Sequence, residues 1–262
     1  MHEKTPDEEM RAVLTGEHPY LHRLRWRMKH LSSSPRCKLC AAPFGGPGGA
    51  VLKHFGYARF AGNPALCEKC ITQFRRSGIS GTEIPVTLLF ADIRGSTGIG
   101  ERMRPAEFRA YLDRFYRIGS DAILRANGIV DKFVGDEVIG LFFGGVTGPQ
   151  HQEAAIRAAL DILERAGRED ATPAGPIPIG AAVHTGEAYV GGTGSEGAVD
   201  DFTALGDVVN TTARLAGAAA AGELIVSTTA AEAAARDTTG AEHRTLDLRG
   251  RHEPIAVVAI RP

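Results

Sequence analysis

Two aspartates follow apolar segments of the chain, at places where a carboxylate can hold a hard cation. Asp92 comes directly after the apolar run 86–91, and the small-residue turn 93–97 follows it. Such a turn offers backbone N–H groups to an anion such as a phosphate. Asp136 ends segment 132–136 in a Gly-Asp dipeptide, which is typical of a tight hairpin. If the hairpin lies beside the first strand, the two carboxylates can share Mg²⁺ for phosphoryl-transfer chemistry. Each also has a plainer interpretation, Asp92 as a helix cap and Asp136 as an ordinary turn residue.

A third polar element lies in segment 201–215. Asn210 and Arg214 are four residues apart, so on a helix they share one face. An amide and a guanidinium on the same face can hold a ribose and stabilise a charged phosphate. The alternative is an ordinary solvated helix face.

Strands and helices must position these residues, and the apolar pattern predicts both. Helices are expected at 104–126, 150–167 and 206–220. Strands are expected at 86–91, 128–134, 137–143, 177–184, 187–191, 224–227, 241–248 and 255–260. The strands on either side of Gly135-Asp136 and of Thr185-Gly186 are expected to form hairpins. Recurring hairpins favour an α+β fold, with helices packed on a mixed sheet, over a doubly wound parallel sheet.

All four cysteines lie near the N-terminus, as two Cys-x-x-Cys pairs within the Gly/Pro-rich segment 33–80: Cys37, Cys40, Cys67 and Cys70. Four thiolates in this pattern predict a tetrahedral Zn²⁺ site, a zinc-ribbon-like staple for a segment that can hardly build its own core. An iron–sulfur cluster and four unligated thiols are the alternatives. Segment 1–32 has an amphipathic helical pattern, read as a surface or docking helix rather than a membrane-binding one.

Composition excludes several classes of protein. The 262-residue chain has a net charge of −1, which argues against nucleic acid or an anionic membrane as a bulk partner. The acidic start of the chain does not look like a secretory signal, and no apolar run reaches the ~20 residues needed to span a bilayer. A cytoplasmic protein is therefore expected.

Four separated motifs in this order resemble one family. Segments 90–97, 128–136, 184–187 and 201–215 are similar to the catalytic domain of class III adenylyl and guanylyl cyclases, and the resemblance covers residues 84–262. It implies a mainly antiparallel, ferredoxin-like sheet. The implied reaction is attack of the ribose 3′-oxygen on the α-phosphorus of a nucleoside triphosphate, which forms a cyclic nucleotide and pyrophosphate. The family builds its sites between two catalytic domains, so a homodimer is implied.

The resemblance also assigns roles by position. It implies that Asp92, Asp136 and the Ile93 carbonyl hold two Mg²⁺ or Mn²⁺ ions, that Asn210 orients the ribose, and that Arg214 stabilises charge on the α-phosphate. Further substrate contacts are implied for Lys132, Thr203, Gly95, Ser96, Thr97 and Arg249. His184 and Glu187 are expected to have a structural role in their hairpin.

Lys132 and Thr203 match the family's base-reading positions, and their chemistry favours ATP. Lysine offers only donors, which suits the adenine N1 acceptor and opposes the guanine N1–H. Many adenylyl cyclases have Asp where this chain has Thr203, and the Lys/Thr pairing is similar to the subgroup that includes bicarbonate-responsive cyclases. Bicarbonate activation is therefore a hypothesis, which equal rates with and without bicarbonate at fixed pH would reject. The competing interpretations are a guanylyl cyclase, a zinc-containing nucleic-acid-binding protein and a nucleotide-binding module without turnover.

Overall fold

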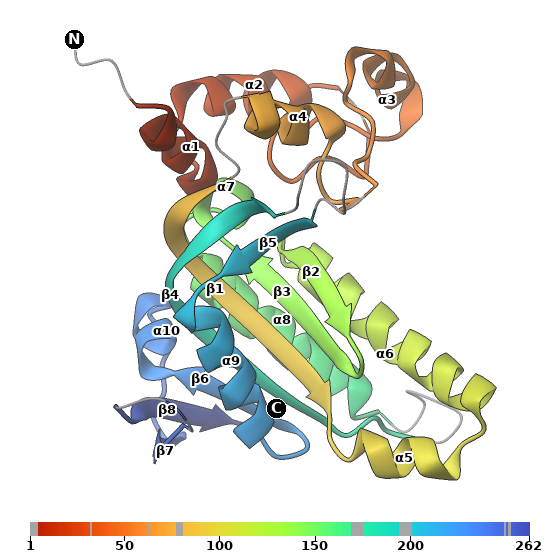
Figure 1. Ribbon diagram of the computed structural model, residues 1–262, viewed down its shortest axis with the longest axis vertical. Coiled ribbons are helices and arrows are strands. Elements are labelled where there is room, and N and C mark those ends of the chain that lie inside the picture. Colours follow the sequence, from red (N-terminus) through yellow and green to blue (C-terminus); the bar gives the residue numbers. More distant parts are fainter. Residues whose placement is uncertain are drawn as a thin grey trace. The chain divides into compact units, whose positions relative to one another are not determined.

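A computed structural model describes most of the chain, namely residues 5–31, 33–61, 63–76, 81–168, 175–193, 201–248, 250 and 253–262. The chain forms two compact units. The first comprises residues 1–86, 143–149 and 187–206, and the second comprises residues 87–142, 150–186 and 207–262. Figure 1 labels the elements of both.

The strands form one mixed, mainly antiparallel sheet of eight strands, in the order β2-β3-β1-β4-β6-β8-β7, with β5 paired to β4. Strands β4 and β6 pair in parallel, whereas the pairs β1–β3, β2–β3, β4–β5, β6–β8 and β7–β8 are antiparallel. The strands are β1 (Gly81–Ile93), β2 (Ile129–Val134), β3 (Glu137–Phe142), β4 (Ile179–Thr193), β5 (Asp201–Leu205), β6 (Glu223–Ser227), β7 (Glu242–Leu246) and β8 (Ile255–Ile260). The expected α+β fold with a mixed sheet is confirmed.

The core of the second unit lies between this sheet and its helices. Leu89, Ala91 and Ile93 alternate along β1 and bury the same face. They pack with the apolar stripe of α6 (Pro105–Arg125), which includes Phe115, and with the alanine-rich face of α8 (His151–Ala166). Figure 1 shows α6 and α8 running beside β1, β2 and β3. This packing fixes β1, and with it the position of Asp92 at the strand's end.

The second unit has three further helices. Two are short, α5 (Ser96–Arg102) and α10 (Thr228–Ala233), and α9 (Asp207–Ala218) is longer. The expected helices at 104–126, 150–167 and 206–220 correspond to α6, α8 and α9 within a residue or two.

The expected hairpin around Thr185-Gly186 is wrong, because residues 179–193 form one continuous strand, β4. Gly186 is not among the glycines with positive φ, so the backbone does not turn there. Instead the strand changes partner along its length. Residues 180–183 pair with β6 in parallel, and residues 189–193 pair with β5 antiparallel.

The single helix expected in segment 1–32 is also wrong, because two helices form there. These are α1 (Pro6–Thr15) and α2 (Pro19–Lys29). Helix α1 ends at Gly16, whose φ of 85° is the left-handed conformation that glycine adopts most easily. Pro19 then starts the second helix at a position where its missing N–H costs nothing.

The cysteine segment is built from short helices rather than strands. It contains α3 (Gly46–Leu52), the 3₁₀ turn η1 (Lys53–Phe55) and α4 (Glu68–Arg76). Isolated β-bridges join Arg36 to Pro43 and Arg59 to Cys67. The first unit also includes the one-turn helix α7 (Gly144–Thr147).

Candidate active site and four-cysteine centre

The two predicted metal aspartates lie at the same end of the antiparallel β1–β3 pair. Asp92 is opposite Glu137 in the strand register, and the Ile93 N–H donates to the Asp136 carbonyl at 3.2 Å. Gly135 has a φ of 59°, so it makes the left-handed turn between β2 and β3 that places Asp136 there. Asp92 and Asp136 are both half-buried. The expectation that the hairpin lies beside the first strand is met by this geometry.

The Arg94 side chain lies within electrostatic reach of three carboxylates, those of Asp92, Asp136 and Glu137. Its guanidinium forms an ion pair with the Asp92 carboxylate and also donates to the Gly217 carbonyl, 3.2 Å away near the C-terminal end of α9. Burial lowers the pKa of Arg94, while the charges of Asp136 and Glu137 oppose that shift. Arg94 therefore links Asp92 to the helix that carries Asn210 and Arg214.

Glu137 adds a third carboxylate beside the pair. Burial, and then the charge of Asp136, raise its pKa to about 7. Neither Arg94 nor Glu137 was among the site residues expected from the sequence. A signal was available for each, since Arg94 is two residues after Asp92, in the turn that follows the strand, and Glu137 directly follows Asp136.

The substrate residues expected near the base lie on two strands. Lys132 is on β2, half-buried, and forms an ion pair with Asp131 at 3.4 Å. A register shift between Val130 and Lys132 places Lys132 opposite Ile139. Thr203 lies on β5, opposite Gly191, and is 4% exposed.

Asn210 and Arg214 are both exposed on α9, one turn apart. The Arg214 guanidinium lies close to Gly250, because a Cβ built on Gly250 would be 3.5 Å from Nη2 of Arg214. Arg249, which was expected to contact the triphosphate, lies outside the described residues.

The small-residue turn after Asp92 begins helix α5. Gly95 has a φ of 69° and precedes the first helical residue, Ser96, which is half-buried, while Thr97 is exposed. His184 and Glu187 have partners elsewhere, the His184 ring at 2.9 Å from the Ser227 hydroxyl and Glu187 at 3.8 Å from Arg11.

Residues 81–259 match the family of adenylate and guanylate cyclase catalytic domains. The chain belongs to this family. The cyclase is 32% identical over 158 residues to an adenylate cyclase of Anabaena cylindrica, which covers 57% of the chain and 31% of that relative. It is also 32% identical over 158 residues to adenylate cyclase 1 of Rhizobium meliloti, covering 58% of the chain and 23% of that relative. The matches thus span a third or less of these curated relatives.

Solved structures of a guanylyl cyclase and of an adenylyl cyclase both resemble the chain. The guanylyl cyclase Cya2 has a TM-score of 0.63 and 27% identity, covering 69% of this chain and 93% of that one. The adenylyl cyclase CyaB from P. aeruginosa has a TM-score of 0.61 at 24% identity, covering 70% of this chain and 97% of that one, a likeness of fold. The comparisons therefore establish the family and the fold. Among the helices in the described residues, none has the length and apolar character to cross a bilayer.

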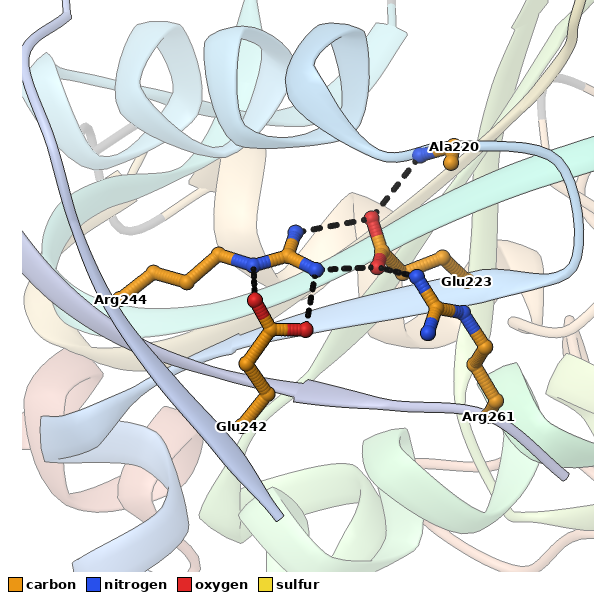
Figure 2. A network of polar contacts seen from close by, with 5 residues as sticks. All are labelled: Ala220, Glu223, Glu242, Arg244 and Arg261. Atoms are coloured by element: carbon orange, nitrogen blue, oxygen red, sulfur yellow. Dashed lines mark hydrogen bonds and ion pairs between the residues drawn. The ribbon is translucent and has the colours of Figure 1, made fainter.

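A buried ion-pair network holds the loop that follows α9 in the cyclase (Figure 2). Glu223, 1% exposed at the start of β6, accepts two hydrogen bonds from Arg244 at 2.9 and 3.2 Å and one from Arg261 at 2.8 Å. It also accepts the backbone N–H of Ala220 at 3.0 Å. Burial alone would raise the pKa of Glu223, but the bond from Arg244 and the other partners outweigh it and lower that pKa. The network therefore anchors the end of α9 to the sheet.

The four cysteines of the cyclase come together in one cluster. The Cys37 and Cys70 sulfurs are 4.0 Å apart, those of Cys40 and Cys67 are 3.7 Å apart, and all four lie within 4.8 Å of one another. Four thiolates around Zn²⁺ at ~2.3 Å have their sulfurs ~3.8 Å apart by tetrahedral geometry. Disulfides would need about 2.05 Å. The cluster therefore has the size of a site for a single tetrahedral ion.

Local backbone structure aims these sulfurs inward. Cys37 and Cys40 flank a tight turn in which the Ala41 N–H donates to the Cys37 carbonyl at 2.9 Å. Ala41 takes a φ of 62°, so the turn is closed by a left-handed residue. Cys67 precedes α4 and Cys70 lies in its first turn. Hydrogen bonds from Cys40, Cys67 and Cys70 lower the pKa of Cys37 well below its ordinary value.

Proposed function

We propose that this cyclase converts ATP to 3′,5′-cyclic AMP and pyrophosphate at sites shared by two copies of the chain. The observation that carries the reaction is the meeting of Asp92 and Asp136 at one end of the β1–β3 pair. Adenylate cyclases among the relatives, and Lys132 at the base-reading position, support ATP as the substrate.

The residues at this strand end fit divalent metal ions. Two half-buried carboxylates, with a backbone carbonyl between them in sequence, supply the oxygen ligands that Mg²⁺ and Mn²⁺ prefer. Bound ions would lower the pKa of the ribose 3′-hydroxyl and neutralise charge on the pyrophosphate. Asp92 must exchange its ion pair with Arg94 for this role.

The remaining chemistry is positioning and charge stabilisation by the protein. Asn210 holds the ribose so that its 3′-oxygen lies in line with the α-phosphorus, which removes much of the entropic barrier. Arg214 donates to the α-phosphate oxygens as negative charge develops on them. Their exposure on one face of α9 suits two side chains that act on a ligand rather than on their own fold.

Base selection rests on Lys132 and Thr203. A lysine donor faces the N1 acceptor of adenine, and the threonine hydroxyl accepts from the adenine amino group. Guanine would place its N1–H against the ammonium and leave a buried donor without an acceptor. Lys132→Glu is therefore expected to lower the ATP/GTP preference at least tenfold, measured as the ratio of kcat/KM values. An unchanged ratio would remove Lys132 from base recognition.

The deciding assay measures cyclic nucleotide formed by purified protein from ATP or from GTP, each with Mg²⁺ and with Mn²⁺. We expect cyclic AMP from ATP, and its loss in Asp92→Ala. Cyclic GMP from GTP in excess of cyclic AMP from ATP would favour the guanylyl alternative, which the similarity to the guanylyl cyclase Cya2 also supports. No product from either nucleotide, in folded dimeric protein, would refute the proposal.

A shared site makes a further prediction about mixtures. Asp136 and Arg214 then act from different chains, so Asp136→Ala and Arg214→Ala are each inactive alone. Mixed heterodimers regain one intact site of two. If co-expressed variants recover no activity although heterodimers form, the two residues do not act across a dimer.

We also propose that the four cysteines hold one structural zinc ion. The sulfur spacing fits a single tetrahedral ion, and a cluster of several irons needs its thiolates spread around an inorganic core. Metal analysis should give about one zinc per chain in colourless protein. A single iron with a visible chromophore, or well under one metal per chain, would overturn this assignment.

A further inference from the structure

The one-turn helix α7, which the chain reaches immediately after β3, is held by the N-terminal segment. The Arg25 guanidinium on α2 donates to the Gly145 carbonyl at 2.6 Å. Gly145 is buried, and β3 is the strand that begins one residue after Asp136. Arg25 therefore contacts the segment that directly follows β3 in the sequence, and β3 itself directly follows Asp136, a proposed metal ligand.

Helix α1 contacts the same turn through its backbone. A Cβ built on Gly145 would lie 2.5 Å from the carbonyl oxygens of Val13 and Leu14, and one built on Gly144 only 2.2 Å from that of Thr15. No side chain fits at either glycine without moving the backbone. The turn is thus packed closely against the end of α1, and Arg25 holds it through a directed hydrogen bond.

The position of Arg25 depends in turn on the cysteine centre. The same guanidinium donates to the carbonyls of Lys38 and Leu39, each at 2.8 Å. These two residues lie between Cys37 and Cys40, so the turn that carries two metal-ligating thiolates sets the directions of their carbonyls. These three carbonyl acceptors match the fixed, planar arrangement of N–H donors on a guanidinium. A lysine ammonium cannot reproduce that arrangement.

Charge gives a second reason for the arrangement. A zinc ion with four thiolates carries a net charge of −2, and a half-buried cation beside it offsets that charge. Burial lowers the pKa of Arg25, and the nearby charges of Cys37, Cys40 and Cys70 oppose the shift. Arg25 therefore lies within electrostatic reach of the thiolates and in hydrogen-bond contact with the turn.

We propose that the zinc-filled cysteine centre positions Arg25, and that Arg25 in turn holds the Gly144–Thr147 turn in place, so that zinc occupancy controls the order of the segment that follows β3. Arg25 is a positioning residue and touches no substrate. The inference rests on the zinc assignment above and adds a defined route by which the N-terminal segment acts on the cyclase.

Hydrogen exchange of the zinc-loaded protein tests this route directly. The amides of Val146, Thr147 and Gly148 donate to carbonyls within the turn, so peptides covering 143–149 report its opening. In Arg25→Gln we expect these amides to exchange about tenfold faster or more, as for the loss of a charged hydrogen bond, while zinc stays at one per chain. Arg25→Lys should restore the protection only in part.

Two further variants separate the steps. Arg23→Gln, at an exposed position on the same helix, is the matched control and should leave exchange in 143–149 unchanged. Cys37→Ser with Cys40→Ser keeps Arg25 but removes zinc ligands, and should speed exchange in 143–149 as much as Arg25→Gln does. Cyclic nucleotide formation should fall in both, measured as kcat with little change in KM.

The outcomes discriminate between the proposals. Equal exchange in Arg25→Gln and Arg23→Gln would overturn the Arg25 contact. Zinc-free double-serine protein with an unperturbed turn would overturn the dependence on metal. A wild-type chain that binds zinc but forms no cyclic nucleotide would refute the proposed function alone, because the exchange comparison needs no turnover.

Discussion

Replacing Glu223 by Gln tests whether the ion-pair network of Figure 2 stabilises the part of the sheet formed by β6, β8 and β7. Glu223 is 1% exposed, and Arg244, its bidentate partner, has a side chain 26% exposed. An amide keeps one acceptor but turns an NH₂ group toward the guanidinium, so at least one charge-assisted bond is lost and donors oppose each other. Charge-assisted bonds contribute ~1.5–3 kcal/mol each, and the bond from Arg261 counts little because that side chain is 62% exposed. We expect the free energy of unfolding to fall by about 2–3 kcal/mol.

Equilibrium urea denaturation at pH 7 measures this loss, and Glu242→Gln is its matched control. Glu242 pairs with the same Arg244, but its side chain is 56% exposed, so its loss should cost less than about 1 kcal/mol. The folded-state pKa of Glu223 is lowered, so its contribution is present above the ordinary carboxyl pKa and is lost as pH falls through the folded value. The wild type and Glu223→Gln should therefore converge in acid. Equal losses in the two variants, or a difference that persists in acid, would refute the reasoning.

Three other perturbations follow from the structure. Gly145→Ala should lower the free energy of unfolding by about 2 kcal/mol or more in urea, because its Cβ meets main-chain oxygens of α1 at 2.5 Å. Burial lowers the pKa of His151 to about 4, so the folded state resists its protonation, and stability should decline by about 2–3 kcal/mol as pH falls from ~6.5 to ~4. His151→Gln should flatten that decline in thermal melts taken across this range. Arg94→Gln removes a cation from the Asp92 carboxylate, so Mn²⁺ should bind about five- to tenfold more tightly in a paramagnetic titration without nucleotide.

The sequence carried enough information to predict that Asp92 lies at the end of a strand and that Asp136 lies in the turn of a hairpin. Asp92 closes an apolar run and Asp136 occupies a Gly-Asp turn, and both signals are local in sequence. The sequence left the pairing of this hairpin with the first strand as a condition, and in the structure β3 pairs with β1 antiparallel. The two Cys-x-x-Cys pairs likewise predicted that the four thiols come together, because this spacing in a Gly/Pro-rich segment is typical of metal ligands.

Features set by tertiary partners could not be predicted in the same way. Thr185-Gly186 looks like a turn, yet β4 stays extended because β6 pairs with one part of it and β5 with the other. That choice depends on β6, whose paired residues lie 43 positions further along the chain, and non-local pairing overrides local turn propensity. The break at Gly16 and Pro19 was visible in the sequence, but the amphipathic period of the segment obscured it.

Two arginines illustrate why a role can be harder to see than an element. Arg94 escaped notice because its importance lies in two partners, Asp92 and the Gly217 carbonyl, that only the folded chain brings together. Arg214 was noticed because it lies on an apolar helix, and the fold leaves it exposed beside Gly250. A guanidinium satisfied inside the chain can adjust the site it contacts, whereas an exposed one on a rigid helix can reach a ligand. Because Arg94 joins Asp92 to the end of α9, a change at Asp92 and a shift of Arg214 are mechanically connected within one chain. If the sites are shared between two chains, this connection links the metal side of one site to the phosphate side of the other.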